Sequence, residues 1–329
     1  MNQKFTDFIA PIRHKNIAIA VSGGADSLAL LHMSMMAGLK IVALHVNHKL
    51  RPDADADAAH VQSMANAWGI DIQILTWAGD KPNTGIEDAA RTARYKLMTD
   101  YCQKNGIDIL MVAHHADDQI ETFLMNLARG SGVYGLAAMR PITIRDGIKI
   151  MRPLLTIRRE ELRTYCVDHG ITFVHDEMND DEHYARVRMR RRRACLTKEL
   201  GISDDRILLA IKNLGRTRDA LDDYIAQRQE NLVHDNRAIF DAFFLFDEAP
   251  DIRLKLLGNL LHQIGGNNYP PRLDALERAL KRLGGDCKFT LGGCVLRRLG
   301  EKILIAPEGA RTSFKVRKGN EKTKQHSKA

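Results

Sequence analysis

The first half of the chain alternates short apolar runs with longer segments of helical periodicity, and this alternation constrains the fold most strongly. The apolar run 17–21 ends in Ser-Gly-Gly and leads into a helical pattern over residues 28–36. Three further pairs follow, over 41–45 and 53–68, 72–77 and 86–105, and 109–113 and 117–129. Parallel strands need such crossover helices between them. The order therefore predicts an α/β fold with a doubly wound parallel sheet.

Polar residues that follow these runs are expected to gather at one edge of the sheet. In open α/β sheets, ligands bind outside the carboxyl ends of the strands. Ser22, His45 and His114 each stand at such an end. The sequence therefore predicts a single crevice that these three side chains share.

The chain has 329 residues, which is long enough for two domains. We assign residues 1–200 to the α/β domain, whose last clear pattern is a helical run over 157–169. Residues 201–310 are expected to form a second, mostly helical domain. Its predicted elements are helices over 204–229, 254–262 and 273–283 and a strand pair over 289–306. The basic tail 311–329 has little apolar content, and we expect it to be flexible.

The charge balance favours a polyanionic partner. Lys and Arg number 49 against 41 Asp and Glu, a formal charge of +8 at pH 7. The five cysteines show no C-x-x-C spacing, which disfavours a zinc site, an iron–sulfur cluster or a disulfide framework and favours the reducing cytoplasm. No apolar stretch approaches the ~18 residues of a membrane span, so we expect a soluble protein without membrane contact. The sequence does not determine the oligomeric state, and a homodimer is compatible with it.

The loop after the first apolar run carries the strongest chemical signal. Gly23 and Gly24 let backbone N–H groups approach a phosphate at the start of a helix, where the helix dipole adds positive potential. Ser22 and Ser27 can donate hydrogen bonds to phosphate oxygens. Asp26 would repel a phosphate unless a cation lies between them, so it predicts Mg²⁺. The alternative is a Gly-Gly turn with Ser27 as a helix cap. The loop is not a Walker A motif, because no Gly-Lys-Ser/Thr follows.

The loop and four further motifs resemble a known enzyme family. Ser22–Ser27, read SGGADS, resembles the pyrophosphate loop of N-type ATP pyrophosphatases. The other four motifs resemble those of tRNA(Ile)-lysidine synthetases, and they lie at residues 45–51, 113–122, 129–136 and 176–190. In the last of these, Met178 stands where that family usually has Ser, and Val187 where it usually has Asn.

The resemblance implies an ATP-dependent ligase. ATP and Mg²⁺ would adenylate C2 of the wobble cytidine of tRNA(Ile) with a CAU anticodon, releasing pyrophosphate. Free L-lysine would then displace AMP and give lysidine. His45 and His114 are expected to contact the nucleotide. A zinc site at these histidines is disfavoured, because no cysteine or carboxylate has the usual ligand spacing.

Three acids on one predicted helix form a second candidate site. Asp117 and Glu121 are four residues apart and share a face, with Asp118 beside them. Such like charges destabilise a helix unless a cation relieves them. We expect Asp26, Asp117 and Asp118 to hold Mg²⁺, and Asp26, Asp117 and Glu121 to act in catalysis, one carboxylate accepting the proton that lysine loses. The alternative is a solvated acidic face.

Arginines supply two more candidate sites. Arg91 and Arg94 share a helical face with Glu87, which suits either a surface ion-pair ladder or, as the resemblance implies, stabilisation of phosphate charge. Six arginines fall within residues 186–193, and this density predicts contact with tRNA phosphates through Arg186, Arg190 and Arg191. The alternative for this cluster is a solvated charged helix.

Two other functions compete with the ligase. A tRNA thiolase on the same scaffold would usually need paired cysteines or a cluster, and this chain has only isolated cysteines. A non-catalytic RNA-binding module would not need the intact loop or the acids that follow.

Overall fold

The structure is a computed structural model that describes residues 3–49, 54–79, 81–82, 84–174, 185–267 and 270–309. The chain divides into two compact units, Met1–Arg218 and Asp219–Ala329. The division falls within helix α9 (Asp204–Gln229), whereas the sequence placed a boundary just before this helix. Because α9 is continuous, its early residue Ile207 is buried in a cluster of the first unit and its late residue Ile225 in the core of the second.

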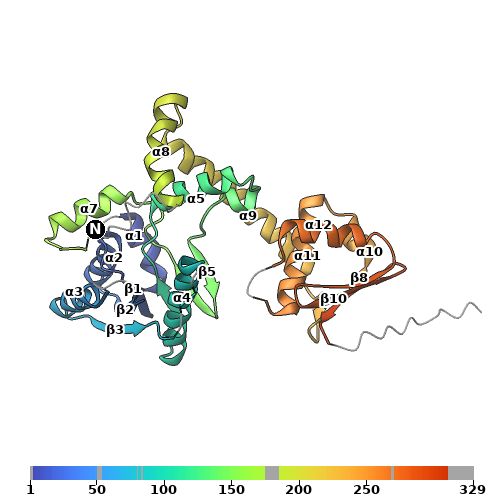
Figure 1. The fold of residues 1–329 in the computed structure, drawn as a ribbon, viewed down its shortest axis with the longest axis horizontal. Coiled ribbons are helices and arrows are strands. Elements are labelled where there is room, and N and C mark those ends of the chain that lie inside the picture. The colour runs from blue at the N-terminus through green and yellow to red at the C-terminus, as the bar shows by residue number, and fades with distance from the viewer. Residues whose placement is uncertain are drawn as a thin grey trace, which may run out of the picture. The chain divides into compact units, whose positions relative to one another are not determined.

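The first unit is built on a six-stranded sheet with the order β3-β2-β1-β4-β6-β5 (Figure 1). All pairs are parallel except the β5–β6 hairpin, which adds an antiparallel edge. The strands are β1 (Asn16–Ala20), β2 (Lys40–Asn47), β3 (Asp71–Thr76), β4 (Ile109–Met111), β5 (Ile142–Arg145) and β6 (Ile148–Met151). The carboxyl ends of β1, β2, β4 and β6 therefore share one edge of the sheet.

Helices cover both faces of this sheet, as the short apolar runs require. Ile17 and Ile19 of β1 are buried on one face with α2 (Ala25–Met36), α3 (Ala54–Ala67) and α7 (Arg159–Asp168). The N-terminal α1 (Gln3–Ile9) and the short 3₁₀ helix η1 (Ala10–Ile12) join that side. Ala18 points to the other face, where Tyr95 and Met98 of α4 (Ile86–Lys104) are buried. In Figure 1, β1 to β3 lie between α2 and α3 on one side and α4 on the other.

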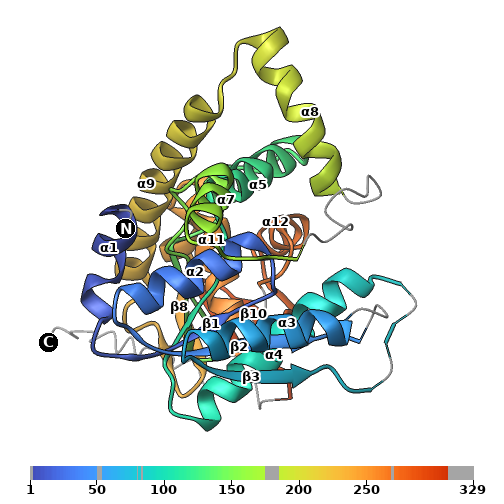
Figure 2. The ribbon, with the colours of Figure 1, turned by 90° about the vertical axis from the view of Figure 1, so that its left-hand side faces the viewer.

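Helices α5 (Ala116–Ala128), α8 (Ala185–Leu200) and the first part of α9 pack together beyond the sheet (Figure 2). Ile120 and Leu124 of α5 are buried against Ile211 of α9. Met189 and Leu196 of α8 pack on the same cluster. The arginine-rich helix is thus attached to the helix that carries the predicted acids. A short α6 (Val133–Leu136) follows α5.

The second unit packs helices on a five-stranded antiparallel sheet with the order β7-β8-β11-β10-β9. The strands are β7 (Val233–His234), β8 (Arg237–Asp241), β9 (Cys287–Leu291), β10 (Cys294–Leu299) and β11 (Lys302–Pro307). The helices are α10 (Ala242–Phe246), α11 (Pro250–Gly265) and α12 (Leu273–Arg282). Leu257 and Leu261 of α11 are fully buried with Leu296 and Ile305 of the sheet.

The predicted fold class is confirmed, since a mostly parallel, doubly wound sheet is followed by a second unit rich in helices. Two details differ from the sequence analysis. The β5–β6 and β7–β8 hairpins were not predicted, because their strands are too short to show a clear period. The expected strand pair over 289–306 is a set of three strands. No helix among the described residues is long and apolar enough to cross a bilayer.

Candidate active site

The loop between β1 and α2 is held by hydrogen bonds between its own residues. The Ser22 amide donates to Ser27 Oγ over 3.1 Å, and the two hydroxyl oxygens lie 3.2 Å apart. Ser27 Oγ in turn donates to the Gly24 carbonyl over 2.9 Å. Ser27 is buried, whereas Ser22 is exposed. The second serine therefore shapes the loop, and the first is the one that faces solvent.

Position 23 requires a glycine, both because of its backbone conformation and because of the side chain beside it. Its φ is +94°, a region that residues with a Cβ rarely adopt. A Cβ there would also lie 3.2 Å from Cγ2 of Val61. The Gly23 carbonyl accepts a hydrogen bond from the Val174 amide at 3.0 Å. Gly24 differs, because its φ is −74° and it is the N-cap of α2.

Asp26 lies in the first turn of α2 with one oxygen unsatisfied. Its Oδ1 is buried and has no hydrogen-bond partner among the described residues. Its Oδ2 lies 3.4 Å from Nε2 of His115. A buried carboxylate oxygen without a partner is costly, so this atom is suited to a cation that arrives with a ligand.

His115 caps the N-terminus of α5 and faces three carboxylates. Its Nδ1 accepts from the Asp118 amide at 3.3 Å, while Asp118 Oδ2 accepts from the His115 amide at 3.0 Å. Nδ1 also lies 3.9 Å from Asp117 Oδ2. Burial lowers the pKa of His115, but the Asp26 hydrogen bond and the charges of Asp118 and Asp117 outweigh burial, so the pKa is raised overall. The ring thus bridges the loop after β1 and the helix after β4.

Asp117 differs from Asp26 because the protein satisfies both of its oxygens. Oδ2 accepts from the Arg159 amide at 2.8 Å, and Oδ1 accepts from Nη2 of Arg193 at 2.7 Å. Burial raises the pKa of Asp117, but the Arg159 amide and Arg193 lower it more, so the net pKa is below its usual value. The carboxylate therefore stays charged and fixes α7 and α8 against α5.

The same network continues into α9. Arg193 also bonds Asp204. Asp204 accepts from Nη1 of Arg158 at 3.2 Å, and Arg158 pairs with Asp205 as well. The sequence analysis assigned Arg193 to the arginine cluster without foreseeing these partners. Its charge is balanced by two aspartates, Asp117 and Asp204.

Glu121 and Gln119 complete the inward side of α5. Glu121 is 1% exposed, so it does not belong to a solvated acidic face. Gln119 exchanges two hydrogen bonds with the backbone of Met139, at 3.0 and 2.8 Å. The segment after α6 is thereby attached to α5.

Three histidines take different positions: His45 lies within β2, His48 directly after it, and His114 after β4. His45 is buried, and its Nδ1 is 2.9 Å from the Val21 carbonyl, so it holds the start of the loop between β1 and α2 in place. Burial lowers the pKa of His45, which favours a neutral ring that donates to Val21. His48 is packed edge-on against Trp77, and burial followed by the charge of Arg94 lowers its pKa to about 4. His114 is half-buried in the segment between β4 and α5.

Arg91 and Arg94 both lie in the first half of α4, toward the edge of the sheet that carries the loops. Arg94 is close enough to His48 to depress its pKa. The Arg91 guanidinium lies over the Tyr95 ring, 5.3 Å from its centre. The side chain of Glu87 is outside the described part of the structure, so the ion-pair ladder of Glu87, Arg91 and Arg94 stays a prediction.

The predicted RNA-binding arginines lie on α8, which the structure describes as a helix. The side chains of Arg186, Arg190 and Arg191 are outside the described part of the structure, as are residues 176–184 of the fourth motif and the basic tail. Their role in tRNA binding stays a prediction.

The structure allows a simple test of whether the site suits Mg²⁺. Among the described residues, no group of three or more His, Cys, Asp or Glu side chains is placed to hold a metal ion. Mg²⁺ in nucleotide enzymes usually takes one or two carboxylates and completes its shell with phosphates and water. The unsatisfied Oδ1 of Asp26 at a phosphate-type loop fits this pattern.

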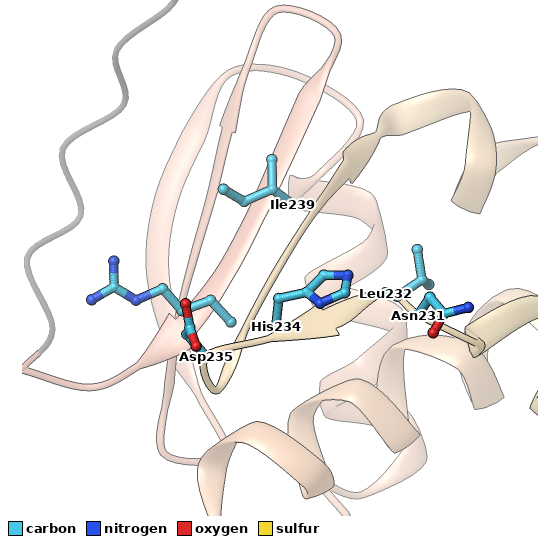
Figure 3. A pocket seen from close by; sticks show the side chains of 6 residues that line it. Asn231, Leu232, His234, Asp235 and Ile239 are labelled. Carbon is cyan, nitrogen blue, oxygen red and sulfur yellow. The ribbon is translucent and has the colours of Figure 1, made fainter.

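One cavity in the described part of the chain belongs to the second unit (Figure 3). It has a volume of about 570 Å³ and lies at the β7–β8 hairpin. Its lining residues are Asn231, Leu232, His234, Asp235, Arg237 and Ile239. None of the predicted site residues belongs to it.

Comparisons with known proteins agree with the motifs. A family model described as a PP-loop domain matches residues 1–196. The tRNA(Ile)-lysidine synthase of Ruegeria pomeroyi is 35% identical over 300 residues, covering 89% of this chain and 71% of that protein. The tRNA(Ile)-lysidine synthase of Wolbachia pipientis is 37% identical over 310 residues, covering 91% of this chain and 72% of that protein.

A solved structure supports the fold. The U34-tRNA thiolase from Methanococcus maripaludis, determined with its [4Fe-4S] cluster, gives a TM-score of 0.55 at 16% identity. The match covers 65% of this chain and 78% of that chain. At this identity the likeness shows a shared fold only.

Proposed function

Because the chain belongs to the tRNA(Ile)-lysidine synthase family of PP-loop proteins, we propose that it converts the wobble cytidine of tRNA(Ile) with a CAU anticodon to lysidine, using ATP and free L-lysine. The observation that carries this proposal is the loop after β1, where an exposed serine, a left-handed glycine and an unsatisfied Asp26 oxygen meet. Such a loop is suited to the phosphates of ATP at a helix N-terminus.

The reaction has two steps. The C2 carbonyl oxygen of the cytidine attacks the α-phosphorus of ATP, and the bond to the bridging oxygen breaks to release pyrophosphate. The ε-amine of lysine then attacks C2, the C2–O bond breaks, and AMP leaves. Activating C2 first divides one difficult substitution into two easier ones.

Residues of the loop bind and orient the nucleotide. The Ser22 hydroxyl and the backbone N–H groups at the start of α2 would donate to phosphate oxygens, and Ser27 and His45 hold the loop in shape. His114 is proposed beside the nucleotide. Arg91 and Arg94 are proposed to stabilise phosphate charge from α4. Mg²⁺ would be held by Asp26, with Asp118 nearby across His115, and would neutralise charge on the departing pyrophosphate.

The acids of α5 divide into two roles in this proposal. Asp117 acts as a positioning residue, because Arg159 and Arg193 occupy both of its oxygens. Asp118 and the buried Glu121 are the carboxylates proposed for the lysine amine and its proton. Mutating Asp118 and Glu121 separately would show which of them binds the amine and which accepts its proton.

The tRNA is proposed to lie along α8, where Arg186, Arg190 and Arg191 would meet its phosphates. Arg193 of the same helix pairs with Asp117 and Asp204. A cytoplasmic location fits five free cysteines. A homodimer remains a prediction, which sedimentation at several concentrations would test.

The test is pyrophosphate release from ATP with tRNA(Ile), with and without lysine, followed by mass analysis of the wobble nucleoside. We expect release to depend on the tRNA and the nucleoside to gain the mass of lysine less water. Pyrophosphate release with sulfur in place of lysine would instead make the chain a thiolase. No release with either nucleophile would refute the ligase.

A further inference from the structure

Two arginines from different elements lie over one buried tyrosine. Tyr95 of α4 is 3% exposed. The Arg145 guanidinium, at the end of β5, lies 4.5 Å from the centre of its ring, and the Arg91 guanidinium lies 5.3 Å from it. Cation–π contacts of this kind orient the guanidinium groups, but they do not neutralise their charge.

A third arginine joins the group from the neighbouring strand. Arg152 follows β6 directly and is 9% exposed. Its Nη1 donates to the Arg140 carbonyl at 3.0 Å and to Thr143 Oγ1 at 3.1 Å. Its Nε is buried and has no hydrogen-bond partner among the described residues. A buried donor on a charged side chain is thus left for a ligand.

Positive charge exceeds negative charge in this cluster of Arg91, Arg145 and Arg152. Within the described part of the chain, Asp146 is the one acid that pairs with any of the three, with its Oδ2 4.0 Å from Nε of Arg145. Asp146 also accepts a hydrogen bond from Thr99 at 3.1 Å. Burial lowers the pKa of Arg152, Tyr95 opposes this effect, and the charge of Arg91 adds to the lowering. Such a cluster is stabilised when an anion binds to it.

Arg91 and Arg152 lie toward the edge of the sheet where the reaction is proposed. Arg145, opposite Ile148 at the start of β6, is at the other end of the β5–β6 hairpin and joins the cluster through its contact with the Tyr95 ring. The Val112 amide donates to the Met151 carbonyl at 2.9 Å, which sets Arg152 beside the segment that leads to His114. The loop after β1 ends at the same edge, because β1 and β4 are parallel neighbours. The three arginines come from other elements than that loop, and they form a separate group.

We propose that Arg91, Arg145 and Arg152 form a second phosphate-binding site, additional to the loop that binds the ATP phosphates. Planar guanidinium groups supplied by three elements would match the several oxygens of a phosphate group. The proposal rests on the function proposed above, which supplies two sources of phosphate: the tRNA backbone and the nucleotide itself.

The experiment measures tRNA(Ile) binding at several salt concentrations, without ATP or lysine, and separately the KM for ATP in pyrophosphate release. The main variant is Arg145→Gln, and Arg152→Lys keeps the charge but removes the fork in case the glutamine variant is unstable. Arg13→Gln is the matched control, since Arg13 is exposed and lies in the turn before β1, outside the cluster. Thermal melting verifies that each variant is folded.

A tRNA phosphate in the site predicts about tenfold weaker tRNA binding by Arg145→Gln, and a salt slope smaller by about one. A nucleotide phosphate predicts unchanged tRNA binding and an ATP KM raised by about tenfold. Both results support the site and identify the source. If Arg145→Gln and Arg152→Lys match Arg13→Gln in both measurements, the site is refuted. Because tRNA binding needs no turnover, this result is distinct from failure of the ligase reaction.

Discussion

The loop after β1 and the N-terminus of α5 each present an aspartate to His115, but the protein treats the two carboxylates differently. Asp26 has a buried oxygen with no hydrogen-bond partner among the described residues. Asp117 has both oxygens bonded, to Arg159 and Arg193. Acids that look equivalent in the sequence are therefore distinct: one is left for a ligand, and the other holds three helices together.

The two aspartates therefore have different roles, since Asp26 is available to bind a ligand and Asp117 positions its neighbours. A carboxylate that the fold has satisfied contributes to stability, and removing it leaves charged partners unpaired. A carboxylate that the fold has left unsatisfied costs stability and is retained for what it binds. Mutation of Asp26 should therefore change mainly the activity, and mutation of Asp117 mainly the free energy of unfolding.

The largest effect is expected for Asp26→Asn. Pyrophosphate release should fall by about 10²- to 10³-fold, the usual cost of losing a group that stabilises developing charge. The free energy of unfolding should change little, because within the described residues the lost charge pairs with His115 alone, across 3.4 Å. Release assays and urea unfolding check both parts, with Asp71→Asn, at the exposed start of β3, as the control. Full activity in Asp26→Asn would contradict the assigned role.

Asp117→Asn should mainly reduce stability. The amide group would face the Arg159 amide and the Arg193 guanidinium with one acceptor instead of two, and we expect a loss of about 2 kcal/mol. Urea unfolding measures this loss. The double variant with Arg193→Gln should lose less than the sum of the single losses, because the two residues share one interaction. Additive losses would show that the pair is not coupled.

Gly23→Ala should disturb the loop by about 1–2 kcal/mol. The positive φ and the nearby Val61 side chain both oppose a Cβ. We expect a lower melting temperature and a raised KM for ATP. Gly24→Ala is the matched control for stability, since Gly24 has a negative φ and its Cβ would meet only Ser22 Oγ, at 3.7 Å. Equal melting of the two variants would argue against strain at Gly23.

The smallest effect is a pH dependence from His48. Its pKa is about 4 in the folded chain, below the ordinary value of 6.5, chiefly because of burial and the charge of Arg94. The unfolded state therefore binds more protons between pH 6.5 and about 4, and stability falls as the pH falls through this window. The full pKa difference would cost about 2 kcal/mol by pH 5, and solvent screening of the half-buried ring reduces the expected loss to about 1 kcal/mol. Urea unfolding at several pH values should show a smaller slope for His48→Asn, and an unchanged slope would contradict the assignment.

The parallel strands and the loop after β1 could be predicted from the sequence because their signals lie in short, continuous segments. Short apolar runs alternate with helical segments, so β1 to β4 and their helices were predicted near their observed bounds. Two adjacent glycines marked the loop. The β5–β6 hairpin could also have been found, because Asp146-Gly147 is a strong turn signal and both residues have positive φ. The short strands beside it concealed that signal.

The partners of Asp117 could not be predicted, since they come from distant parts of the chain. Arg159 is 42 residues away and Arg193 is 76 residues away. Composition cannot reveal which of six clustered arginines turns inward to an aspartate. His115 did leave a local signal, because a polar residue three positions before Asp118 matches a capping box. The sequence analysis named this histidine only as part of a motif.

The most direct test of the contrast between the two aspartates is the affinity for ATP as a function of Mg²⁺ concentration, in the unchanged protein, Asp26→Asn and Asp117→Asn. If Asp26 is the open carboxylate, Mg²⁺ should strengthen ATP binding in the unchanged protein and in folded Asp117→Asn, and this gain should be lost in Asp26→Asn. A gain that persists in Asp26→Asn and disappears in Asp117→Asn would contradict the account.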